Sequence, residues 1–196
     1  MNLNISKKVI LFMIISLSLS LFFNYKFYKY IREENELYTI YINDFFIEIE
    51  NAILQIELIT KEKNKEDIHQ QIFSLTEHLN NLDYMVRRVP YYIDGMGGLS
   101  NFIGTASTVI NRGTKYEGSY IPPFINDHKL TKQEIAYLEL LKSYLEIIYK
   151  DLLSKRNNQL SEDITKNKFK NIINENIYVS GKEDKLLEEY INNDKN

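Results

Sequence analysis

The strongest constraint on the fold is that the first 89 residues contain neither glycine nor proline. Both residues destabilise helix interiors, so their absence permits long helices through this part of the chain. A run without charged residues, Val9 to Phe23, follows directly after Lys7 and Lys8. With its uncharged flanking residues the run reaches about 20 residues, the length of a membrane-spanning helix. The sequence therefore predicts a transmembrane signal-anchor over residues 9–25, in contact with membrane lipid.

Two other interpretations of this apolar run stay open. A cleaved signal peptide also has a basic start and an apolar core of about 7–15 residues, and Ser18 and Ser20 supply small side chains for cleavage. The third interpretation is the core helix of a soluble domain. The anchor is favoured because aromatic residues gather at the far end of the run, where a membrane–water interface would lie. They are Phe22, Phe23, Tyr25, Phe27, Tyr28 and Tyr30.

Charged residues on the two sides of the run bear on its orientation. The two lysines before it favour a cytoplasmic N-terminus under the positive-inside rule. Lys26, Lys29 and Arg32 follow it and oppose that assignment. A short tail before the span is typical of a signal-anchor, so we expect residues 1–8 in the cytoplasm. The chain is then a single-pass protein of the cell membrane whose bulk is extracytoplasmic.

Two helical stripes of apolar residues follow the predicted anchor at steps of three and four. The first is Tyr38, Ile42, Phe45, Ile49, Ala52, Ile56 and Ile59, and the second is Ile68, Ile72, Leu75, Leu79, Leu82, Val86 and Val89. The second stripe is out of phase with the first by two residues, a rotation of about 200°. One straight helix cannot bury both, so the polar run 61–66 is predicted to be the turn of an antiparallel hairpin.

Two further helices and a short tail helix are expected in the second half of the chain. Thr131 and Glu134 have the spacing of a capping box. The stripe after it is Ile135, Leu138, Leu141, Leu145, Ile148 and Leu152, and a fourth helix over residues 161–178 is marked by Ile164, Phe169, Ile172, Ile173 and Ile177. Residues 179–196 form a tail whose helix is marked by Leu186, Leu187, Tyr190 and Ile191.

The predicted fold class is therefore all-α, with the transmembrane helix followed by an antiparallel, four-helix bundle over residues 26–178. Core packing is the main interpretation of each coiled-coil-like stripe. Self-association through one exposed seam is the alternative, so a homo-oligomer is a possible assembly.

A long insertion, residues 90–130, separates the second and third predicted helices. All three prolines and six of the seven glycines lie between residues 90 and 123. Long connections in compact domains are commonly functional or disordered, and the aromatic content argues against disorder. A short helix over residues 99–111 is expected between two loops.

The aromatic residues of the insertion are the candidate binding residues, because aromatics on turns supply contact area at little entropic cost. They are Tyr91, Tyr92, Phe102, Tyr116, Tyr120 and Phe124. Arg87 and Arg88 precede them and could meet an anion, or they form an ordinary solvated helix end. The alternative for the aromatics is that they cap the open end of the core.

The sequence contains no recognisable catalytic or cofactor motif. The run 94–98 is rich in glycine but lacks the lysine and the preceding strand of a phosphate loop. His69 and His78 lie on opposite faces of their helix, and His128 lies in a loop, so neither a metal nor another cofactor is expected. After the first four lysines the chain has 20 basic and 27 acidic residues, which argues against nucleic-acid binding.

These observations predict a membrane-anchored protein that acts by binding a protein partner or a component of the cell envelope. The first alternative is a small-molecule sensor or an accessory subunit of a membrane complex, which would need an apolar pocket beneath Phe102 and Phe124. The second alternative is an enzyme of unfamiliar type, which would need ionisable groups to converge in one cleft.

Overall fold

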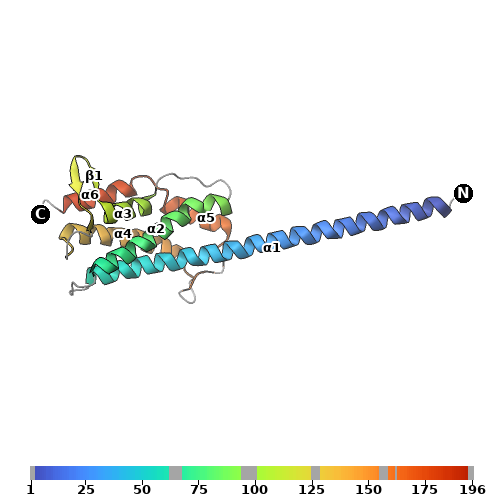
Figure 1. Ribbon diagram of the computed structural model, residues 1–196, viewed down its shortest axis with the longest axis horizontal. Coiled ribbons are helices and arrows are strands. Elements are labelled where there is room, and N and C mark those ends of the chain that lie inside the picture. Colours follow the sequence, from blue (N-terminus) through green and yellow to red (C-terminus); the bar gives the residue numbers. More distant parts are fainter. Residues whose placement is uncertain are drawn as a thin grey trace. The chain divides into compact units, whose positions relative to one another are not determined.

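The computed structural model of this protein describes residues 3–61, 68–93, 101–124, 129–154, 159–161 and 163–193. It is mostly helical and has one long apolar helix at its N-terminus (Figure 1). In chain order the elements are α1 (Leu3–Lys61), α2 (Ile68–Tyr92), α3 (Phe102–Arg112), β1 (Thr114–Tyr116), β2 (Ser119–Ile121), α4 (Lys132–Leu152), α5 (Lys166–Asn176) and α6 (Lys182–Asn192). The chain divides into two compact units, Met1–Ile42 and Asn43–Asn196.

The N-terminal unit contains one helix that is long and apolar enough to cross a membrane. None of its most apolar 18-residue window is buried within the chain, and every side chain from Val9 to Phe23 is exposed. A core helix of a soluble domain would cover these side chains with other parts of the chain. The soluble-core interpretation of this run therefore has no support in the described residues.

The two apolar stripes predicted from the sequence on α1 and α2 are buried. Every residue of both stripes is at most 8% exposed, which confirms their assignment to the core. Polar side chains join the two helices beside this core. Glu48 of α1 lies 2.7 Å from the Nδ1 atom of His78 and accepts a 3.1 Å hydrogen bond from the amide of Asn81, both on α2.

Helix α4 begins with the predicted capping box. The amide of Glu134 donates to the Thr131 hydroxyl, and the Thr131 amide donates to the Glu134 carboxylate at 2.6 Å. The prediction of Ile135 as a core residue is wrong, because Ile135 is 36% exposed whereas Glu134 and Tyr137 are buried. The first turn of α4 presents Glu134 to the interior, where its carboxylate is satisfied by Thr131.

Helix α2 continues to Tyr92 and includes Pro90, so the expected start of the insertion at residue 90 is too early. A proline in a helix has no amide hydrogen to donate to the carbonyl four residues earlier. That carbonyl belongs to Val86, and it accepts a 3.1 Å hydrogen bond from the hydroxyl of Tyr178. The segment after α5 thus supplies the donor that Pro90 lacks.

The remaining elements pack on α2 and α4. Helix α3 contacts α2 and α6, while α4 contacts α5 and α6. The expected helix 99–111 is observed as α3, the expected helix 161–178 is shorter and is α5, and the tail helix is α6. The hairpin β1–β2 is an addition that an all-α prediction did not include. The glycine-rich run 94–98, His128 and most of the predicted turn 61–66 lie outside the described residues.

Candidate functional site

The candidate binding residues are divided between the end of α2 and the segment formed by α3 and its following hairpin, and α3 is fixed to α2 by a polar network. Asn101 caps α3 by accepting a 3.0 Å hydrogen bond from the amide of Gly104, and its own amide donates to the Asp83 carboxylate at 2.8 Å. Ser107 donates to the side-chain oxygen of Asn80 at 2.6 Å. Asn101 and Ser107 are buried, so these bonds compensate for the lost contact with water.

At Gly104, helix α3 lies directly against the Asp83 side chain. A methyl group at residue 104 would come within 2.6 Å of the Asp83 carboxylate. A glycine is therefore needed for Asp83 to reach Asn101.

Both candidate arginines are engaged by neighbours on α2. Arg87 donates to the second Asp83 oxygen at 2.8 Å, and this bond is the main reason that the pKa of Arg87 is raised. The guanidinium of Arg88 lies over the ring of Tyr84, 4.4 Å from its centre. Each guanidinium thus has a neighbour on its own helix, a carboxylate for Arg87 and an aromatic ring for Arg88.

The hairpin is built around two glycines at positive φ. Gly113 ends α3 at φ 68°, and a methyl group there would clash with the carbonyl of Ile121. Glu117 (φ 47°) and Gly118 (φ 81°) form the two-residue turn, as in type I′ hairpins. Ile121 is fully buried, so the base of the hairpin is anchored in the core.

The two faces of the hairpin have different roles. Tyr116 is half-buried, and its pKa is raised, first by burial and then by the nearby carboxylates of Asp184, Glu117 and Glu188. Lys115 and Tyr120 are paired across the strands and are both exposed, with Tyr120 at 62%. The outward face of the hairpin therefore presents a tyrosine ring beside a lysine.

Phe102 and Phe124 lie in the core instead of on the surface. Phe102 is fully buried, and its ring meets the ring of Tyr144 edge to face at 5.5 Å, with the Lys182 amine near both rings. Phe124 contacts the rings of Tyr137 and Tyr190 at 5.3 and 5.9 Å. Because aromatic side chains occupy this space, the described residues give no basis for a pocket beneath the two phenylalanines.

Lys182 is the cation of this aromatic cluster. Its amine donates to the carbonyl of Asn176 at 2.6 Å, and its pKa is lowered mainly by burial. The ammonium group thus joins the end of α5 to the rings of α3 and α4.

Tyr91 and Tyr92 lie at the other end of α3 from the hairpin. Tyr91 is 85% exposed on the last turn of α2, whereas Tyr92 is half-buried. Helix α3 has 11 residues and so separates the two regions by about 15 Å. The structure thus divides the candidate residues into an exposed hairpin face, an exposed α2 end and a buried aromatic core.

A second surface, on α1, was not singled out from the sequence. Residues Asp44, Ile47, Asn51, Leu54 and Leu58 face away from the buried stripe, and we call them the outer seam. Ile47, Leu54 and Leu58 are 43–50% exposed. The spacing of the five outer-seam residues alternates between three and four, which is a helical pattern that the sequence contained. The stronger pattern of the buried stripe obscured it.

Grooves run along both sides of the outer seam. One, of about 310 Å³, lies between Leu54 on α1 and Tyr149 on α4. The other, of about 300 Å³, lies between Ile47 on α1 and Tyr84 on α2. The larger hollows along residues 10–40 are lined by one helix alone and are not enclosed.

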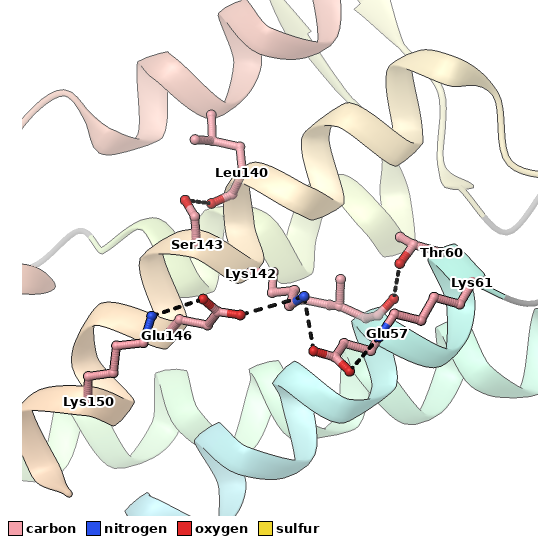
Figure 2. Close-up of polar contacts among 9 residues, drawn as sticks. Glu57, Thr60, Lys61, Leu140, Lys142, Ser143, Glu146 and Lys150 are labelled. Atoms are coloured by element: carbon pink, nitrogen blue, oxygen red, sulfur yellow. Dashed lines mark hydrogen bonds and ion pairs between the residues drawn. The ribbon is translucent and has the colours of Figure 1, made fainter. Parts of the chain in front are cut away.

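An ion-pair network fixes α1 to α4 at one end of the outer seam (Figure 2). The amine of Lys142 lies 3.0 Å from the Glu57 carboxylate and 3.5 Å from that of Glu146. The pKa of Glu57 is lowered by its hydrogen bonds to Lys61 and Lys142. These groups are paired with one another, an arrangement typical of helix packing and not of acid–base catalysis.

Within the described ranges, no three His, Asp or Glu side chains converge closely enough to hold a metal ion. Comparison of the chain with protein-family models, curated proteins and solved structures found no match. The surfaces themselves are thus the basis for any assignment of function.

Proposed function

We propose that this chain is a membrane-tethered binding protein whose C-terminal unit contacts a protein partner or an envelope component. Residues 9–25 act as the anchor, since their exposed apolar side chains suit a hydrocarbon environment better than water. The C-terminal unit works as an antiparallel helical bundle that carries residues 90–130 as an insertion. It lies outside the cytoplasm.

The main observation that supports this proposal is the exposed outward face of the hairpin. Most of the Tyr120 side chain is exposed. It lies on a short, tightly turned hairpin, so little conformational entropy would be lost on binding. Gly113 and Ile121 hold the base of the hairpin. A tyrosine and a lysine side by side supply an aromatic surface, a hydroxyl and a positive charge. Tyrosine is enriched among the residues that contribute most to binding at protein interfaces.

Tyr91 is the second contact candidate, at a separate position. Its ring is the most exposed large aromatic of the C-terminal unit's described residues. Because α3 lies between Tyr91 and Tyr120, one small ligand cannot touch both rings. A partner that contacts both must be a macromolecule.

Site-specific photo-crosslinking in cells tests the proposal. A photoreactive phenylalanine analogue replaces Tyr120 or Tyr91 in the full chain, and Glu139, an exposed residue of α4, serves as the control position. We expect a discrete adduct from position 120, weakened by Lys115→Ala, and no matching adduct from position 139. If positions 120 and 91 give only the background of position 139, the proposal is wrong.

Protease treatment of intact cells tests the orientation. A tag placed after Asn196 is lost from the membrane fraction if the C-terminal unit is outside. Protection of the tag until lysis would reverse the assignment, and Lys26, Lys29 and Arg32 would then be the positive-inside flank.

A further inference from the structure

The outer seam of α1 has the pattern of a helix that pairs with another helix. Leu54 and Leu58 are 50% and 47% exposed, while Ile56 between them is fully buried in the core. The spacing 44, 47, 51, 54 and 58 is a heptad pattern that places Ile47 and Leu54 at one core position and Leu58 at the other. In the sequence the pattern also takes in Leu37 and Ile40, each 58% exposed.

The acidic residues that flank the outer seam are engaged within their own chain. Glu50 accepts a 2.8 Å hydrogen bond from Tyr149, and Glu57 is paired with Lys142 and Lys61. Glu48 is bonded by Asn81 and lies beside His78. Like charges along two facing seams oppose pairing, and the ion pairs of Glu57 with Lys142 and Lys61 reduce that opposition.

We propose that the outer seam binds the outer seam of a second copy of this chain in a parallel arrangement. Both copies would enter the same membrane at the N-terminal end of α1, so their helices run in the same direction. A two-fold axis then brings each seam residue opposite itself. This step rests on the membrane anchor of the proposed function, but not on the hairpin surface.

Asn51 is the residue of the outer seam that best fits a second copy as the binding partner. Asn51 sits at a core position where a buried asparagine pairs across a parallel dimer and fixes its register. The seam is only about two heptads long in the C-terminal unit, which is short for a coiled coil in solution. Anchoring in one membrane raises the effective concentration of the two copies and offsets this shortness.

Asp44 is the one seam residue that works against pairing. Asp44 is exposed, at a position that would lie in the core of the coiled coil. In a parallel dimer its carboxylate would face the Asp44 carboxylate of the second copy. Asp44 therefore limits the stability of the dimer, and removal of its charge should strengthen the pairing.

Disulfide crosslinking of the full chain in membranes tests the proposal, because the natural sequence contains no cysteine. Single cysteines replace Asn51, Leu54 or Leu58 on the seam. Ile53→Cys, beside the seam, and Val179→Cys, 42% exposed outside α1, are the controls. We expect several-fold more oxidant-induced dimer from the seam positions than from either control.

Two further changes are made in the Leu54→Cys chain. Leu58→Glu should lower the dimer fraction several-fold, and Asp44→Asn should raise it. Equal crosslinking at residues 53 and 54, no dimer at any seam position, or an adduct only with a different protein would overturn the proposal. A loss of photo-crosslinks at residue 120 would contradict binding through the hairpin but would not change the disulfide crosslinking of the seam. The two proposals can therefore be tested independently.

Discussion

The hydroxyl of Tyr178 donates a 3.1 Å hydrogen bond to the carbonyl of Val86, the acceptor that Pro90 leaves without its helical donor. This contact joins residues 92 positions apart in the sequence. It explains how α2 continues through a proline to Tyr92. The end of α2, and with it the exposed position of Tyr91, thus depends on the segment that follows α5.

Loss of the Tyr178 hydroxyl should therefore destabilise the fold, and removal of the proline should compensate. We expect Tyr178→Phe to lower the free energy of unfolding by about 1–2 kcal/mol, because a buried carbonyl loses its donor. In a Pro90→Ala background the alanine amide can bond Val86, so the same change should cost about half as much or less. Denaturant unfolding of the four chains of this double-mutant cycle measures the coupling. Equal costs in both backgrounds would show that the two residues act independently.

Tyr137 is expected to tolerate loss of its hydroxyl. Its side chain is fully buried, and among the described residues the hydroxyl has no hydrogen-bond partner. A buried hydroxyl without a partner is unfavourable, so Tyr137→Phe should leave the free energy of unfolding unchanged or raise it by up to about 1 kcal/mol. The ring contact with Phe124 is kept in the variant. A loss above about 1 kcal/mol in thermal or denaturant unfolding would contradict this expectation.

Gly113 should be far less replaceable than Gly118, although both have positive φ. An alanine at either position is strained by about 1 kcal/mol. At residue 113 its methyl group would also clash with the carbonyl of Ile121, whereas nothing lies within 4 Å at residue 118. We expect Gly113→Ala to destabilise the chain by clearly more than Gly118→Ala, about 2–4 kcal/mol against about 1. The melting temperatures of the two variants give the comparison, and equal losses would show that the hairpin base can shift.

The Tyr149 hydroxyl should stabilise the fold, and this stabilisation should be lost at alkaline pH. Burial and the hydrogen bond to Glu50 raise the pKa of Tyr149 from 10 to about 12. The contribution is fully present below pH 10 and is lost as the pH rises toward 12, because the unfolded chain releases this proton first. Tyr149→Phe should therefore lose less stability than the wild type between pH 10 and 12. Parallel melting curves across that range, with Tyr120→Phe as the exposed control, would detect the difference.

Part of this structure was predictable because it follows from local chemistry. The stripes that include Phe45 and Leu79 were identified because an amphipathic helix buries one face whatever its partners are. The capping box of Thr131 was equally local, since its two bonds span three residues. The apolar run after Lys8 specified a membrane-length helix by composition alone.

Two expectations, the absence of strands and the burial of Ile135, differ from the structure. The hairpin was not recognised because its strands have three residues each, and its turn begins with Glu117 at positive φ, which few non-glycine residues adopt. Ile135 was expected in the core, but the first turn of α4 presents Glu134 there instead.

The candidate binding residues illustrate the same division. Spacing and composition predicted turns and a short helix for these aromatic residues, whereas Tyr91 and Tyr92 lie on α2 and Tyr116 and Tyr120 lie on short strands. They also did not determine which rings face outward. Phe124 is buried because the rings of Tyr137 and Tyr190 meet it, and Tyr120 is exposed on the same face of the hairpin as its strand partner Lys115. The helices and the membrane-length segment thus came from the sequence by itself, because periodicity and hydropathy act between near neighbours. The tertiary structure alone decided which aromatic residues form a surface, because burial is set by residues that are distant along the chain.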